Sequence, residues 1–192
     1  MFLIGFPLLL VPFAIYNIVA FLMPGAMADY SKAIELKPDY TKAYVERGTA
    51  KMSKADWAGA MADYNEAIKL NPGRSESYFS RGSIKQAKGD LAGAMADYNK
   101  AIDLKPDLAE AYANRGCAKY EGADYDGAIA DFTKAIELKR NNADAYNNRA
   151  VAHYYVGEYD RAWLDVKMCR QLGRPAEPDF VRKLAETTGR TE

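Results

Sequence analysis

One interval constrains this sequence more than any other feature: related segments recur at a single fixed spacing along the chain. The segment GAMADYSKAIELKP begins at Gly25, close copies begin at Gly59, Gly93 and Gly127, and a more distant copy begins at Arg161. We call this spacing, the step from Gly25 to Gly59, the repeat period. A fixed short period is typical of an array of stacked units, each too small to bury its apolar face alone. The interval therefore predicts a repeat protein.

Each repeat carries the pattern of two helices joined by a turn. Counted from Thr41, the full units are residues 41–74, 75–108, 109–142 and 143–176, and residues 25–40 form a preceding half unit. Apolar residues recur at spacings of three and four, which place them on one helical face. Pro38, Pro72 and Pro106 follow the second half of the early units, and proline cannot continue a helix. The predicted fold class is all-α.

Small and bulky residues form separate rows. The small rows are Gly48, Gly82, Gly116 and Ala150, then Ala60, Ala94, Ala128 and Ala162. The bulky rows are Tyr44, Tyr78, Tyr112 and Tyr146, then Tyr64, Tyr98 and Phe132, and finally Leu70, Leu104 and Leu138. Small residues let two helices approach closely, so we expect the bulky rows to fill the core between them.

These rows resemble the tetratricopeptide repeat (TPR), whose 34-residue unit has aromatic, glycine, alanine and proline residues at the same offsets. The resemblance covers Gly25 to about Ala176 and implies a right-handed superhelical solenoid of antiparallel helix pairs. The last unit departs from the pattern, as terminal repeats commonly do. Residues 177–192 are then expected to form a capping helix and a tail, with Phe180, Val181 and Leu184 covering the last unit.

Two charged rows follow the same period. The arginines are Arg47, Arg81, Arg115 and Arg149, at a position where the family commonly has leucine, and the acids are Asp29, Asp63, Asp97, Asp131 and Asp165. A guanidinium offers five donors and tolerates partial burial when it is paired. Our hypothesis is that each arginine bridges acids on neighbouring second helices; the alternative is a solvated charge on each helix.

The uncharged leader, residues 1–24, has three interpretations. Residues 2–23 are long enough to cross a membrane as a helix, which predicts a single-pass anchor with the repeats in the cytoplasm. A cleaved signal is the second interpretation, although its basic start is absent, and it would make the protein exported. In the third, residues 7–21 are the missing first helix of a soluble protein, with Ala14 in the Gly48 row. Pro12 would cost that helix about 3 kcal/mol.

In proteins of the TPR type, side chains of the first helices line a concave groove that binds extended peptides or helices. The positions implied by this resemblance are Lys42, Val45, Glu46, Thr49, Met52, Glu76, Phe79, Ser83, Gln86, Glu110, Asn114, Cys117, Tyr120, Asp144, Asn147, Asn148, Val151, Tyr154 and Tyr155. The set is mixed and mildly acidic, with an aromatic end. It predicts a protein partner with basic and apolar residues.

The sequence argues against other functions. Its 26 basic residues balance 26 acidic ones, so the basic surface typical of nucleic-acid binding is absent. With one histidine, two cysteines and no phosphate-binding loop, we predict no enzyme, metal or cofactor. His153, in a row of lysines, is expected at the surface, and Cys117 is expected to be inert.

The predicted function is thus a scaffold or assembly factor. A self-assembling structural solenoid and an accessory subunit of an enzyme are the alternatives, and the oligomeric state stays open. Family members that dock chaperone tails hold the peptide carboxylate with lysine, asparagine and arginine side chains. Only Asn114 matches that set, so we expect no docking of heat-shock chaperone tails.

Overall fold

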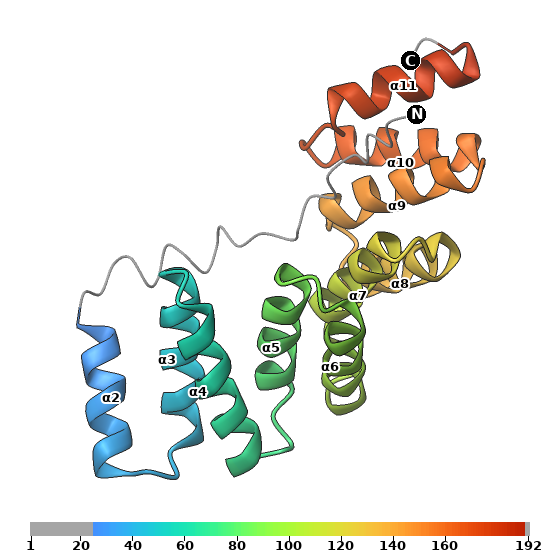
Figure 1. Ribbon diagram of the computed structural model, residues 1–192. Coiled ribbons are helices and arrows are strands. Elements are labelled where there is room, and N and C mark those ends of the chain that lie inside the picture. The colour runs from blue at the N-terminus through green and yellow to red at the C-terminus, as the bar shows by residue number, and fades with distance from the viewer. Residues whose placement is uncertain (1–24, 191–192) are drawn as a thin grey trace. The chain divides into compact units, whose positions relative to one another are not determined.

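The structure is a computed structural model that describes residues 25–190 (Figure 1). Regular structure in this range is helical throughout, without a strand, which confirms the predicted all-α class. The helices are α2 (Ala26–Leu36), α3 (Thr41–Ser53), α4 (Trp57–Leu70), α5 (Ser75–Ala87), α6 (Leu91–Leu104), α7 (Ala109–Glu121), α8 (Tyr125–Leu138), α9 (Ala143–Tyr155), α10 (Tyr159–Gln171) and α11 (Pro178–Thr188).

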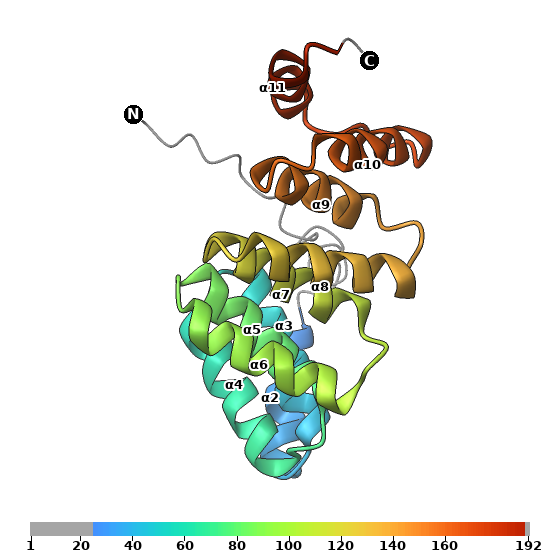
Figure 2. The same ribbon diagram turned by 90° about the vertical axis from the view of Figure 1, so that its right-hand side faces the viewer.

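The helices belong to two compact units. Residues 25–107 form the N-terminal unit, with α2 to α6, and residues 108–190 form the C-terminal unit, with α7 to α11. Helices adjacent in sequence pair within each unit: α3 with α4 and α5 with α6 in the first, α7 with α8 and α9 with α10 in the second (Figures 1 and 2). The first member of a pair is called here the first helix, and the other the second helix.

The turns before α4, α6 and α8 are tight and capped. Asp56 precedes α4, and its carboxylate accepts a hydrogen bond from the Gly59 amide at 2.9 Å, which satisfies one of the unpaired amides of the first turn. Asp90 and Asp124 cap α6 and α8 in the same way. Gly89 begins the turn before Asp90 with a φ of +80°, a conformation that favours glycine.

The core of the α3–α4, α5–α6 and α7–α8 pairs is the contact between a glycine and an aromatic ring. A Cβ added to Gly48 would lie 3.0 Å from the ring of Tyr64, and one added to Gly116 would lie 2.8 Å from the ring of Phe132. Both rings are fully buried. The predicted role of the small rows is confirmed. The leucine row is only partly covered: Leu70 and Leu104 are half-buried, and Leu138 is 37% exposed.

Helix α11 lies beyond the α9–α10 pair in both views (Figures 1 and 2). Phe180 and Leu184 are fully buried in one cluster with Ala150 and Val166, and Val181 packs against the same cluster. The amphipathic segment after the last repeat therefore covers the apolar end of the C-terminal unit.

The prediction of a single-pass membrane protein was wrong. No helix within residues 25–190 has the length and apolar character needed to cross a bilayer. The segment on which that prediction rested, residues 2–23, lies outside the described part of the chain, as do its interpretations as a signal or as a first helix.

Candidate partner-binding face

The first helices are fixed to the second helices by a buried ionic contact. In the N-terminal unit, Arg47 donates from Nε and Nη2 to the two carboxylate oxygens of Asp63, at 3.0 and 2.7 Å. Lys51, one turn further along α3, places its ammonium 2.8 Å from the same carboxylate. The Asp63 side chain is almost fully buried, so two cations compensate for its loss of water.

The same contact recurs at the repeat period. The repeated sets are Arg81 and Lys85 on Asp97, and Arg115 and Lys119 on Asp131, with Arg–Asp distances of 2.6 Å in both. Each guanidinium also lies over the tyrosine three residues before it, with the guanidinium carbon 5.4 to 5.6 Å from the ring centroid. We call this series the ladder.

The ladder also links neighbouring pairs. Nη1 of Arg47 donates to the Ser31 hydroxyl of α2 at 3.3 Å, and Nη1 of Arg81 donates to the Asn65 carbonyl of α4 at 2.8 Å. Arg149 reaches Thr133 of α8 in the same way, at 3.0 Å. Each of these three arginines therefore bridges two second helices, as predicted. The prediction that both contacts would be acidic side chains was wrong, because the neighbouring second helix offers a neutral oxygen.

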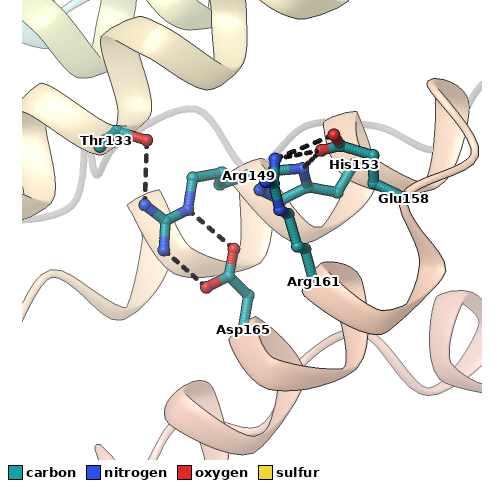
Figure 3. Close-up of polar contacts among 6 residues, drawn as sticks. All are labelled: Thr133, Arg149, His153, Glu158, Arg161 and Asp165. Carbon is teal, nitrogen blue, oxygen red and sulfur yellow. Dashed lines mark hydrogen bonds and ion pairs between the residues drawn. The ribbon is translucent and has the colours of Figure 1, made fainter.

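The last ladder contact has a different composition (Figure 3). Arg149 still pairs with Asp165 at 2.8 Å, but His153 replaces the lysine and turns to Glu158, with 2.6 Å between Nδ1 and Oε2. Glu158 stands where the other pairs have the capping aspartate, and it contacts Arg161 instead of a backbone amide. His153 is 4% exposed, so its predicted place at the surface was wrong.

This histidine should make the C-terminal unit sensitive to mild acid. Burial lowers the pKa of His153 below its ordinary 6.5, although Glu158 and Asp165 oppose the shift. The unfolded chain therefore binds the proton more readily than the folded chain, and stability falls as the pH falls through 6.5. We expect the urea midpoint to drop between pH 7.5 and 5.5, and to drop less in His153→Gln. Equal slopes in both proteins would contradict this assignment.

The predicted groove residues divide into surface and buried sets. Those at or near the surface are Lys42, Glu46, Thr49, Met52, Glu76, Phe79, Ser83, Glu110, Asn114, Tyr120, Tyr154 and Tyr155. Those buried are Val45, Gln86, Cys117, Asp144, Asn147, Asn148 and Val151. We call the surface set the first-helix face. Within each unit, it is the part of the predicted site that a partner can reach.

Buried polar groups support the face from below. The Tyr64 hydroxyl lies 3.1 Å from Oγ1 of Thr49, and the Tyr98 hydroxyl donates to Gln86 at 2.8 Å. Second-helix tyrosines thus extend from the core to the polar side chains of the first helices. This arrangement fixes the rotamers of residues such as Thr49.

The aromatic end of the face is shared with α11. Tyr154 packs edge-on against Phe180 and its hydroxyl lies 3.1 Å from Oγ1 of Thr187, so this ring is partly a packing residue. Tyr155 stacks on Tyr125 with 5.0 Å between ring centroids. Sequence analysis missed Tyr125, because nothing in the repeat places the start of α8 beside the end of α9.

The cationic side chain of Lys183 lies over this aromatic cluster, 5.2 Å from the Tyr154 centroid and 6.0 Å from the Tyr155 centroid. It stands one repeat period after Arg149, so the period could have identified it as a member of the arginine row. The contact shows that these rings accept a cation on their faces.

Cys117 is part of the core rather than of the face. Its side chain is fully buried beside Asn148, whose amide nitrogen lies 3.5 Å from Sγ. Burial raises the pKa of the Cys117 thiol to about 12. The thiolate, which is the reactive form, is therefore scarce at neutral pH, in agreement with an inert role.

No cluster of three or more histidine, cysteine, aspartate or glutamate side chains is placed to hold a metal ion within residues 25–190. The acids of the ladder are separated by the repeat and each is neutralised by its own cations.

Short antiparallel helix pairs with the same buried rows in each pair define a helical-repeat protein. The family model of the TPR repeat matches residues 82–122 and 118–157 of this chain. A search of curated protein sequences found no match.

Three solved structures are similar in fold, and two of them are described as TPR proteins. The crystal structure of MamA has a TM-score of 0.74 at 21% identity, over 85% of this chain and 95% of MamA. YrrB, described as a TPR protein with an unusual peptide-binding site, has a TM-score of 0.66 at 20% identity, over 91% of this chain and 90% of its own. The first TPR of Spaghetti (RPAP3), bound to an HSP90 peptide, has a TM-score of 0.60 at 22% identity. The match covers 61% of this chain and 93% of the Spaghetti chain.

Proposed function

We propose that this chain is a non-enzymatic scaffold for protein–protein interaction, which binds a partner peptide or helix on its first-helix face. One observation carries the proposal: the side chains that build the fold repeat from unit to unit, whereas those on the face do not. Gly48, Asp63 and Tyr64 recur with their contacts, but the accessible position of Lys42 holds glutamate, Glu76 and Glu110, in the next two repeats. Variation on an accessible face of a regular array is what partner recognition requires.

The TPR repeats and the similar structures support a protein as the partner. YrrB is described as having a peptide-binding site, and the Spaghetti domain holds a peptide. Transfer of the chaperone peptide to this chain is not proposed, because Phe79 and Ser83 stand where the resemblance expects the lysine and asparagine of the carboxylate clamp. The general mode of binding is transferred, and the specific ligand is not.

The charges of the face favour a basic and partly apolar partner. Glu46, Glu76 and Glu110 are at or near the surface, against one basic residue, Lys42. Phe79 adds a partly exposed ring, which lies 6.0 Å from the buried ring of Tyr98. A peptide with lysine or arginine beside an apolar anchor would satisfy both features, and its association would weaken as salt rises.

Selection of peptides tests this proposal. We expect a random 12-residue library, panned on the full chain, to yield peptides rich in arginine, lysine and apolar residues. Glu76→Lys should weaken their binding about tenfold, which corresponds to about 1.4 kcal/mol. Asp103→Lys is the matched control, because Asp103 is an exposed acid of the same unit on the second helix α6. Equal loss in both variants, or acidic binders, would contradict the proposal.

A further inference from the structure

Helix α2 has the register of a second helix, and residues 25–190 hold no first helix that pairs with it. Tyr30 stands one repeat period before Tyr64, and Asp29 stands one repeat period before Asp63, so α2 has the register of α4. In α4 the aspartate and the tyrosine are buried together with Ala60 and Ala67. In α2 none of the equivalent residues is buried, and Asp29 is exposed. The difference is the absence of a covering helix among residues 25–190.

The other pairs show what a covering helix supplies. It brings an arginine and, four residues later, a lysine to the aspartate, as Arg47 and Lys51 do for Asp63. It also brings a glycine next to the arginine. A Cβ at that position would lie 3.0 Å or less from the tyrosine ring, so only glycine fits there. Asp29, by contrast, has no ion-pair partner in the described part of the chain.

The opposite end of the described chain is closed by its own side chains. Leu184 of α11 stands one repeat period after Ala150, in the row of small residues. Its side chain is fully buried in one cluster with Ala150 and Val166. The open surface is therefore specific to α2. We call its partly or fully exposed residues the α2 seat: Ala26, Asp29, Tyr30 and Ala33.

The charge of the seat decides which helix fits it. The same register would place Phe13 and Asn17 of the leader opposite Asp29, and residues 1–24 contain no charged residue at all. A helix of that composition would remove water from the carboxylate without supplying a cation, which is costly. A helix with arginine and lysine four residues apart would instead form the ladder contact.

We propose that the α2 seat docks a helix supplied by a different protein, not by a second copy of this chain, and that this helix has the pattern aromatic-x-x-Arg-Gly-x-x-Lys. The guanidinium and the ammonium meet Asp29, the small residue admits the Tyr30 ring, and the aromatic residue stacks on the arginine. The docked helix completes the first repeat of the array and buries the α2 face. This surface is separate from the first-helix face, so it adds a second binding site.

The probe is a fluorescent peptide with the sequence of residues 41–56, titrated into the full chain and followed by anisotropy. We expect binding to weaken at least about tenfold in Asp29→Arg, since a coupled charge pair is lost and a repulsion is added. Glu35→Arg is the matched control: it makes the same charge change on the solvent side of α2 and should bind as the parent does. A peptide carrying R47D and K51D should prefer the Asp29→Arg protein.

Three results would overturn the proposal. Peptide binding that ignores Asp29→Arg would place the peptide elsewhere, for example on the first-helix face. Binding that appears only after removal of residues 1–24 would show that the leader already fills the seat. A doubled mass of the full chain in sedimentation, reversed by Asp29→Arg without any peptide, would identify a second copy as the occupant. Circular dichroism of each variant confirms that the helices are retained.

Discussion

Replacement of Asp97 by asparagine should destabilise the N-terminal unit by about 2 kcal/mol, which for a unit of this size lowers the melting midpoint by roughly 10 °C. The carboxylate receives Arg81 at 2.6 Å and Lys85 at 2.8 Å, and a neutral amide would leave both cations without a counter-charge. Removal of one partner from a fully buried pair costs about 3 to 5 kcal/mol. The expected loss is smaller because the arginine and lysine side chains are about one-fifth exposed and water compensates in part.

The effect should extend beyond one helix pair. Arg81 also donates to Asn65 of the preceding pair, so a guanidinium that loses Asp97 loses its orientation toward α4 as well. Hydrogen exchange should therefore accelerate in α4 as well as in α5 and α6. Asp103→Asn, an exposed change on the same helix, should stay within about 0.5 kcal/mol of the parent. Equal midpoints for the two variants would show that the ladder adds nothing to stability.

The repeat made much of the fold predictable. A single period aligns every row, so the closeness of Gly48 and Tyr64 and the pairing of Arg47 with Asp63 could be expected from sequence. The burial of the leucine row was harder to predict, because periodicity shows which side of a helix is apolar but not how much of that side a neighbouring helix covers. Leu138 lies at the end of α8, where no other helix covers it fully.

The last repeat was harder to predict because two of its substitutions act together. The change from lysine to His153 and the change from a capping aspartate to Glu158 are each ordinary in isolation. Their 2.6 Å contact depends on the turn that brings residue 158 back beside the end of α9. The Tyr154 contact with Phe180 has the same origin, since it depends on how α11 packs. The rows show which residues of different repeats are equivalent. They do not show the contacts that form only in the last repeat.

The last repeat also contains a natural compensation that can be reproduced elsewhere. Ala150 replaces the glycine of the first helix, and Val166 replaces the aromatic residue of the second; both are buried in one cluster. A methyl group and a shorter side chain share the space that a glycine and a ring occupy in the other pairs. The two changes should therefore be tolerated together better than either is tolerated alone.

In the α7–α8 pair, Gly116→Ala should lower the free energy of unfolding by about 1 kcal/mol. The replacement gains about 1 kcal/mol in helix propensity. Overpacking costs up to about 3 kcal/mol, which exceeds that gain. The added Cβ would lie 2.8 Å from the Phe132 ring, closer than real Cβ contacts allow. Phe132→Val should cost about 2 to 3 kcal/mol through the cavity it leaves. The double variant should be more stable than the sum predicts by at least about 1 kcal/mol, since the methyl group enters that cavity.

Urea unfolding of the four proteins measures this coupling, and Ala130→Gly is the control for helix propensity, since Ala130 is exposed in the interior of α8. Additive losses in the double variant would mean that α7 and α8 move apart to admit the methyl group rather than share the space. A coupling that matches the natural pair Ala150 and Val166 would show that the distance between the two helices of a repeat is set by one residue from each.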